Sequence, residues 1–342
     1  MKIKNMAYAL VVGIAIVIIL IYGKNIILPL VLAILIWFLI KGIRNGIKRI
    51  KIRNRIAPLW LQNILAFIIV FGILTFVGKL LANNINKISA LLPLYEANIQ
   101  QMIKQLNDYT GLDIYATLNN YIGDFDFSTI LKSLLNSITD LFGSAFIVII
   151  YVVFLLLEEA IFSLKIKAVF KEQDQFEKVN GILQKVNKSI NSYITLKTMV
   201  SLITGSVSYI VLLILHIDFA FFWAFLIFVL NYIPTIGSLI ATLFPSIIAL
   251  VQFSSFSHFF LVLALIGAVQ ILVGNLLEPR IMGQTLNISP LVVIISLTFW
   301  GAIWGVLGML LSVPIMVMLI IIFAQFENTK SIAVLLSAKG NV

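Results

Sequence analysis

Residues 288–325 form one apolar stretch that is too long for a single straight helix across a membrane. Residues 6–22 and 26–40 are shorter apolar runs, each approaching the roughly 20 residues that cross about 30 Å of hydrocarbon. Hydrophobic residues make up 61% of the chain and charged residues 11%, which is more apolar than a water-facing domain needs. We therefore expect an all-α, polytopic helical membrane protein with about seven to eight membrane segments.

Several enzyme classes are disfavoured by residue content. The chain has no cysteine, so it forms no disulfide, thiolate metal site or cysteine nucleophile. Its two histidines, His216 and His258, lie at the ends of apolar runs, and neither has a second histidine at metal-ligand spacing. No Walker-type glycine loop is present, so a transporter of this sequence would use an ion gradient, with H⁺ or Na⁺ as the coupling ion. We expect no cofactor and no enzymatic activity.

A basic segment, residues 41–55, follows the second apolar run and contains no acidic residue. Its cations are Lys41, Arg44, Lys48, Arg49, Lys51, Arg53 and Arg55. Such a cluster indicates a cytoplasmic loop beside anionic lipid headgroups, either as a topology signal alone or as a specific lipid contact. The net charge of +10 comes mostly from this segment, so we expect no nucleic-acid partner. The sequence predicts a multi-pass protein of the inner membrane with a cytoplasmic N-terminus.

The order of apolar and amphipathic segments predicts five regions. They are 1–81, N-terminal spans with the basic loop; 82–139, an extracytoplasmic helical insert; 140–197, a fourth span and a cytoplasmic amphipathic helix; 198–328, a C-terminal transport core; and 329–342, a cytoplasmic tail. In the insert, apolar residues including Ile88, Leu92, Tyr95 and Met102 recur at helical spacing. A passive packing domain and a lid over a pore both remain open for this insert.

The last third of the chain is apolar but interrupted by helix breakers. Asn231, Pro234 and Gly237 divide one run, and Pro245 is expected to break the run that follows. Broken or re-entrant helices leave polar backbone groups that must be satisfied in lipid, and they form the binding sites of many secondary transporters. An ordinary hairpin turn at the membrane surface explains the same spacing equally well.

Residues 258–277 form the next apolar run, which has one small and polar helical face. Gly267, Gln270, Gly274 and Glu278 follow one another at intervals of three or four residues, with Asn275 beside them. Small residues on one face indicate close helix–helix packing. Gln270 and Glu278 on the same face favour a polar cavity instead.

The segment Glu278-Pro279-Arg280 places two charges between apolar runs. An isolated charge at the bilayer centre costs about 2.5–3.5 kcal/mol on insertion scales, and Pro279 disfavours a continuous helix. A surface loop in water and a structural salt bridge are two explanations. In a third, Glu278 is a protonatable or cation-pairing group and Arg280 is its partner.

Glycine spacing in 288–325 predicts two helices, antiparallel or broken, in place of one. Gly301 and Gly305 form a GxxxG pair and Gly308 follows, in a stretch that also contains Pro314. We expect these three glycines, together with Gly267 and Gly274, at helix-packing positions.

Three segments in the last third resemble the autoinducer-2 exporter family of bacterial membrane proteins. They are "NYIPTIGSLIATLFPSIIAL" (231–250), "NLLEPRIMGQTLNISPLVVIISL" (275–297) and "WGAIWGVLGMLLSVPIMVML" (300–319). The resemblance implies a multi-span transporter; members are linked to export of autoinducer-2, and some to cation/proton antiport. The residues at matching motif positions are Asn231, Pro234, Gly237, Asn275, Glu278, Pro279, Met282 and Gly283.

We therefore expect a secondary transporter that exports a small polar solute such as autoinducer-2. In this hypothesis Glu278 couples transport to an ion, while Asn231, Gln270 and Asn275 offer hydrogen bonds to the solute. The alternatives are a cation/proton antiporter and an uncoupled channel formed by a homo-oligomer, with the insert as its vestibule. A structural scaffold is disfavoured because irregular backbone in lipid is costly. The expected partners are the lipid bilayer, the solute and further copies of the chain.

Overall fold

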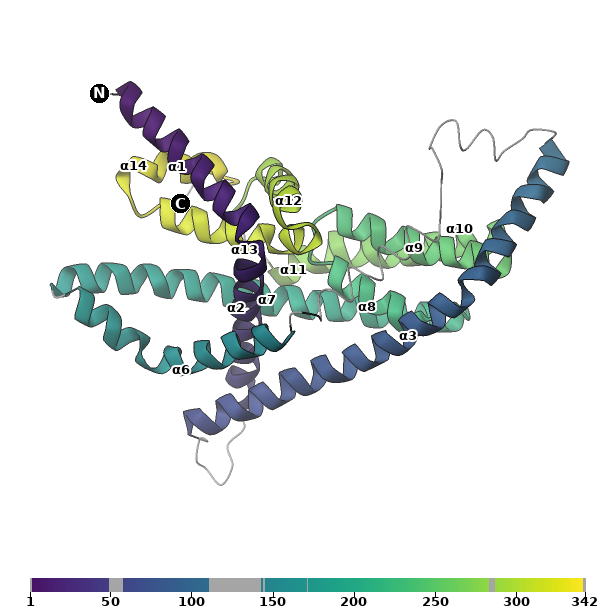
Figure 1. Cartoon of the computed structure of the whole chain (residues 1–342), viewed down its shortest axis with the longest axis horizontal. Helices are drawn as coiled ribbons and strands as arrows, with labels where there is room; N and C mark the ends of the chain where they lie inside the picture. The colour runs from purple at the N-terminus through teal and green to yellow at the C-terminus, as the bar shows by residue number, and fades with distance from the viewer. Residues whose placement is uncertain are drawn as a thin grey trace. The chain divides into compact units, whose positions relative to one another are not determined.

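The computed structural model describes residues 2–48, 58–110, 143, 145–170, 172–282 and 287–340. All regular secondary structure in these residues is helical, which confirms the predicted fold class (Figure 1). The elements are α1 (Lys2–Tyr22), α2 (Lys24–Ile47), α3 (Leu59–Thr110), α6 (Ala145–Val169), α7 (Gln173–Ile214), α8 (Ala220–Leu230), α9 (Ile236–Phe253), α10 (Phe256–Ile271), the π-helix η1 (Leu272–Leu277), α11 (Glu278–Met282), α12 (Pro290–Trp304), α13 (Val306–Phe323) and α14 (Glu327–Leu336). Arg49, Lys51, Arg53, Arg55, Gly283 and residues 111–139 of the predicted insert lie outside the described residues.

The described helices have the lengths and surfaces of membrane spans. Six are long and apolar enough to cross a membrane, and there are seven if the bent helix α6 counts as one. Leu10–Tyr22, α8 and α12 are shorter apolar helices. Large apolar side chains remain exposed along both the long and the short helices, such as Leu10 and Ile19 at 61% in α1 and Phe76 at 63% in α3. Such surface is stable only against lipid or another apolar partner, so the chain is a polytopic helical membrane protein.

The chain divides into two compact units. Unit 1 comprises Met1–Phe71, Ser144–Thr198 and Met282–Val342, and unit 2 comprises Gly72–Gly143 and Met199–Ile281. Helices α3 and α7 each contribute to both units. Each unit therefore contains segments that are far apart in the sequence: the first spans, for example, share unit 1 with the end of the chain.

Unit 1 is built around α2, the first part of α7, α13 and α14. Phe38, Tyr193, Val317 and Ala333 belong to its main apolar core. Helices α12 and α13 form an antiparallel hairpin, in which the Ser296 hydroxyl lies 3.3 Å from the carbonyl oxygen of Ser312. The two predicted helices of 288–325 are therefore present.

Glycines allow the sharp turn of this α12–α13 hairpin. Gly305 joins the helices at φ +64° and ψ −144°, a conformation that residues with a side chain rarely adopt. A Cβ atom on Gly308 would lie 1.9 Å from the carbonyl oxygen of Trp300, so only glycine fits. A Cβ on Gly301 would lie 2.9 Å from Met309 Cε. Gly301 and Gly308 thus pack within the hairpin, while Gly305 forms its turn.

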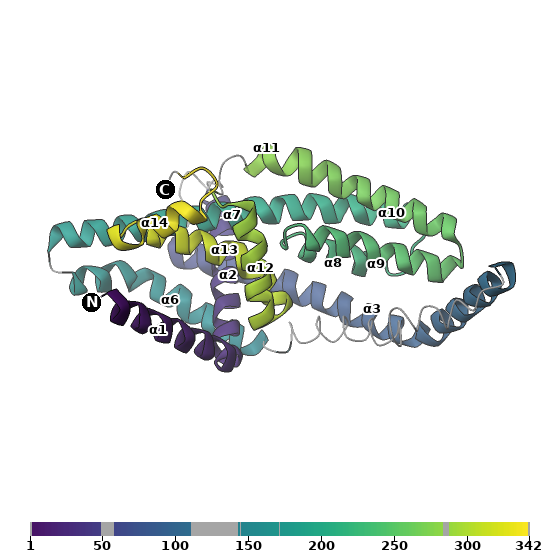
Figure 2. The ribbon, with the colours of Figure 1, turned by 90° about the horizontal axis from the view of Figure 1, so that it is seen from above.

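Unit 2 contains the bundle of α8, α9 and α10 with the last part of α7 and the distal part of α3. Helix α9 packs against α10 on one side and against α8 on another (Figures 1 and 2). A Cβ on Gly267 would lie 3.8 Å from Thr242 Cγ2, which is ordinary packing of α10 on α9. A Cβ on Gly274 would meet no atom within 4 Å.

Helix α3 joins the last part of the predicted N-terminal spans, residues 59–81, and the first half of the predicted insert into one element. At about 1.5 Å per residue, its 52 residues extend about 78 Å, far more than the hydrocarbon thickness. Ile88, Leu92, Tyr95 and Met102 are buried along its distal part, which confirms the predicted helical stripe. The Tyr95 hydroxyl donates to Asp218 Oδ2 at 3.0 Å, and therefore α3 is fixed to the α7–α8 loop within unit 2.

Two predicted proline breaks are wrong. Helix α9 continues through Pro245, since proline is tolerated in membrane helices whose neighbours satisfy the freed backbone. Pro279 also does not interrupt its helix: α10, the π-helix η1 and α11 follow one another directly. The turn that precedes Glu278 and Pro279 is π-helical and therefore wider than an α-helical turn, where a proline ring would clash.

Candidate functional site

The predicted break between α8 and α9 is present and forms a tight turn in unit 2. Helix α8 ends at Leu230 and α9 begins at Ile236. A Cβ on Gly237 would lie 1.8 Å from the carbonyl oxygen of Leu230, and Thr235 has a positive φ of 63°. Pro234, which is half-buried in the segment between α8 and α9, cannot donate a backbone hydrogen bond. The turn therefore brings the start of α9 against the last turn of α8.

Asn231 lies at this turn and points into unit 2. Its side chain is only 9% exposed, and Asn231 Nδ2 donates a 3.0 Å hydrogen bond to Ser201 Oγ of α7. Ser201 belongs to a buried face of α7 that also contains Thr204, Gly205 and Ser208. A Cβ on Gly205 would lie 3.1 Å from the carbonyl oxygen of Ala224 in α8. Small residues on α7 thus allow α8 to approach and place Asn231 beside Ser201.

Gln270 is a second buried polar residue of unit 2, on α10, which packs against α7 next to Ser201. Its neighbour Val269 packs in one buried cluster with Val200, the residue before Ser201. Gln270 is 8% exposed, and its Nε2 has no hydrogen-bond partner within the described part of the chain. We refer to Ser201, Asn231 and Gln270 as the polar layer of unit 2. A buried amide donor without a protein partner is a position where a water molecule or a ligand supplies the missing acceptor.

The other predicted path residues do not join the polar layer. Asn275, in the π-helix, and Arg280 are exposed, whereas Glu278 is half-buried and makes a polar or charged interaction. The π-helical turn explains this separation, because one extra residue rotates all later side chains around the helix axis. The predicted alignment of Gln270 with Gly274 and Glu278 assumed regular α-helical spacing.

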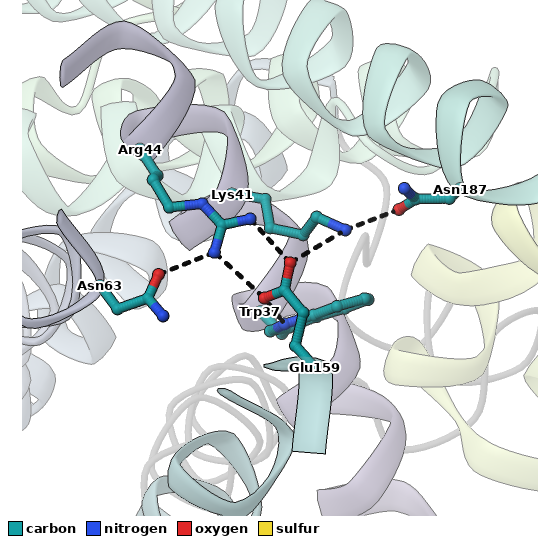
Figure 3. A network of polar contacts seen from close by, with 6 residues as sticks. All are labelled: Trp37, Lys41, Arg44, Asn63, Glu159 and Asn187. Atoms are coloured by element: carbon teal, nitrogen blue, oxygen red, sulfur yellow. Dashed lines mark hydrogen bonds and ion pairs between the residues drawn. The ribbon is translucent and has the colours of Figure 1, made fainter. Parts of the chain in front are cut away.

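Unit 1 contains a second polar cluster, which is centred on Glu159 (Figure 3). Arg44 Nη2 lies 2.7 Å from Glu159 Oε1, and Arg44 Nη1 lies 3.1 Å from Glu159 Oε2. The indole nitrogen of Trp37 donates to the same carboxylate at 3.0 Å. A guanidinium that contacts both carboxylate oxygens forms one of the strongest ion pairs in proteins. This pair joins α2 to α6, which bends by 64° between Ala145–Glu159 and Ile161–Val169.

Two asparagines extend the cluster to two further helices. Arg44 Nη1 donates to Asn63 Oδ1 of α3 at 2.7 Å, and Lys41 Nζ donates to Asn187 Oδ1 of α7 at 2.9 Å. Figure 3 shows these asparagines on opposite sides of the Arg44–Glu159 pair. We refer to Trp37, Lys41, Arg44, Asn63, Glu159 and Asn187 as the Glu159 cluster. It connects the four helices α2, α3, α6 and α7 within unit 1.

Sequence reasoning assigned two of these residues to another role and missed the others. Lys41 and Arg44 were predicted at lipid headgroups, but the structure places them against Glu159, with Arg44 only 5% exposed. Lys48, at the end of α2, is exposed. The available signal was Glu159 itself, an acid at the end of an apolar run on the same predicted membrane side as the basic segment.

Comparison with known proteins identifies the family. The family model described as "AI-2E family transporter" matches residues 9–328. The "AI-2 transport protein TqsA" of Escherichia coli is 35% identical over an alignment of 322 residues that covers 92% of this chain and 90% of that protein. A protein of Haemophilus influenzae named "Putative transport protein" is 31% identical over 334 residues, covering 95% of this chain and 94% of that protein. The chain belongs to the AI-2E family of membrane transporters.

Proposed function

We propose that this protein is a secondary transporter that exports a small polar solute, with autoinducer-2 as the first candidate, driven by an ion gradient. The family and the name of its Escherichia coli relative support this substrate. The structural support is Gln270 of α10, whose buried Nε2 has no acceptor within the described residues, on a helix that packs against α7 through Val269 and Val200. Hydroxyl and amide groups without a net charge suit a neutral solute rich in oxygen.

Glu278 is the proposed coupling residue of unit 2. It is half-buried and directly follows the π-helix, a distortion that is frequent at functional sites. Arg280, two residues later, is exposed, so it does not share the half-buried environment of Glu278. H⁺ and Na⁺ are the candidate ions.

Liposomes that contain the purified protein and an internal pH dye test this function. We expect an imposed autoinducer-2 gradient to move protons, or a Na⁺ gradient to drive autoinducer-2, in the unsubstituted protein but not in Glu278→Gln. Proton movement with Na⁺ or K⁺ but without autoinducer-2 would identify a cation/proton antiporter instead. Autoinducer-2 leak at equal rates from both proteins, without any ion movement, would identify an uncoupled pore.

The hydrogen bonding of the polar layer predicts different stabilities for two substitutions of similar shape. Gln270→Leu removes a buried donor that has no partner among the described residues, so the free energy of unfolding should change by less than about 1 kcal/mol. Asn231→Leu removes the partner of buried Ser201 and should cost about 1–3 kcal/mol. Thermal unfolding in detergent measures both. Equal losses would mean that Gln270 is a structural residue like Asn231.

A further inference from the structure

The Glu159 cluster of unit 1 contains one more positive charge than negative charge. Lys41 and Arg44 face a single carboxylate, that of Glu159, while Trp37, Asn63 and Asn187 are neutral. Lys48, one turn beyond Arg44, is exposed and adds no counter-charge. The neighbouring acid Glu158 pairs with Lys165 at 2.6 Å. One cation of the cluster is therefore not neutralised by its described surroundings.

The two cations are held differently. Arg44 contacts both oxygens of Glu159, at 2.7 and 3.1 Å, and forms a closed pair with it. Lys41 Nζ lies 3.6 Å from Glu159 Oε1, which is beyond hydrogen-bond distance. Its close contacts are Asn187 Oδ1 at 2.9 Å and the ring of Trp37, whose centroid is 4.1 Å away. Lys41 is thus the surplus cation of the cluster.

Only one of these cations can release a proton. Arginine stays protonated in proteins, whereas the charged form of a lysine is disfavoured when its nitrogen is removed from water. The side chain of Lys41 is 13% exposed, so its nitrogen is largely removed from water but keeps a route to it. A neutral amine still donates a hydrogen bond to Asn187, and the Arg44–Glu159 pair is then electrically balanced. The hydrogen bond to Asn187 is therefore available to both protonation states of Lys41.

We propose that Lys41 is a proton-exchanging site of this transporter, with Arg44 and Glu159 as its fixed, charge-balanced neighbours. The proposal rests on the proposed function in so far as the proton is used to drive transport. The ammonium at Nζ loses one proton to water and becomes an amine, and the charge of the cluster changes from one positive charge to zero. Asn187 of α7 and the Trp37 ring of α2 contact this nitrogen directly, so its charge acts on two helices of unit 1.

Lys41→Arg separates proton exchange from positive charge. It keeps the charge, the contact with the Trp37 ring and a donor for Asn187, but it cannot release a proton. In proteoliposomes we expect Lys41→Arg to carry autoinducer-2 down its own gradient while losing accumulation driven by a pH gradient. Lys41→Gln, which has no charge in any state, should lose the same driven accumulation. Lys165→Arg is the matched control, since Lys165 is exposed and pairs with Glu158 at the surface.

A second measurement is independent of the solute. Acetic anhydride labels neutral amines, and mass spectrometry over a pH series gives a labelling midpoint for each lysine of the unsubstituted protein. We expect the midpoint of Lys41 to fall within the pH range of the transport assay and that of Lys165 to lie above it. Limited access lowers the extent of labelling at Lys41 but leaves its midpoint unchanged.

These measurements distinguish failure of the two proposals. Unsubstituted protein that moves no autoinducer-2 under any gradient would contradict the proposed function, and the labelling midpoint would still decide on proton exchange. Full pH-driven accumulation in Lys41→Arg would overturn the role of Lys41 in coupling. A Lys41 midpoint equal to that of Lys165 would overturn proton exchange at this site.

Discussion

Gly237→Ala is expected to destabilise unit 2 by roughly 3 kcal/mol or more, at the upper end of the cost of overpacking. A Cβ at this position would lie 1.8 Å from the carbonyl oxygen of Leu230 and 3.1 Å from Ile233 Cβ. The first obstacle is backbone, so no side-chain rotation relieves it. The turn would have to open, and Asn231 would move away from Ser201 with it. We therefore expect a large loss of thermal stability in detergent together with loss of transport.

Gly267→Ala is the control for this prediction. It adds the same methyl group to the same unit, where the nearest atom outside its own helix turn, Thr242 Cγ2, is at an ordinary 3.8 Å. Alanine also favours a helix interior over glycine by about 1 kcal/mol. The melting temperature should be unchanged or higher. A Gly237→Ala protein as stable as Gly267→Ala would show that the α8–α9 turn is not held closed in the native protein.

Glu159→Gln is expected to cost about 3–5 kcal/mol, the range for breaking a buried ion pair by removing one partner. Arg44 is 5% exposed, and Glu159 is the one acid that pairs with it within the described residues, so the substitution leaves a buried guanidinium without a counter-charge there. It also leaves Lys41 beside Arg44 with no carboxylate between them. The loss should appear as a lower melting temperature of the purified protein.

The adjacent residue provides a matched control for Glu159. Glu158 forms an ion pair with Lys165 in which the two side chains are 43% and 58% exposed. Surface pairs contribute about 0–1 kcal/mol, so Glu158→Gln should be nearly neutral. In addition, Arg44→Gln/Glu159→Gln should lose less stability than the sum of its single substitutions, because both remove one interaction. Equal effects at positions 158 and 159 would contradict a buried pair.

The sequence predicts those features of the fold that depend on local chemistry. Long apolar runs predict the helical membrane fold, and the breakers between Asn231 and Gly237 predict the division of α8 from α9. Pro245 and Pro279 are prolines like Pro234, but neither ends its helix. A continuous helix tolerates a proline whose surroundings satisfy the backbone. Sequence alone does not show those surroundings.

The candidate site could be predicted only in part. Asn231 and Gln270 were predicted by their polarity inside apolar runs, and the structure buries both in unit 2, where Asn231 bonds to Ser201 of α7 and α10 packs on α7 through Val269. Ser201 was missed because a serine in a membrane helix has no distinctive pattern. The Glu159 cluster was missed for another reason: Arg44 and Glu159 are 115 residues apart, and charges at the ends of apolar runs are equally explained by topology. Pairing between distant helices depends on packing.

Efflux of isotope-labelled autoinducer-2 from proteoliposomes tests the central claim, that the polar layer of unit 2 binds the exported solute. The comparison is between the unsubstituted protein, Gln270→Leu, Gly267→Ala and protein-free liposomes, with equal amounts of correctly folded protein. We predict saturable efflux for the unsubstituted protein and for Gly267→Ala, and efflux near the protein-free rate for Gln270→Leu. Efflux from Gln270→Leu at the unsubstituted rate and with the same concentration dependence would contradict the claim.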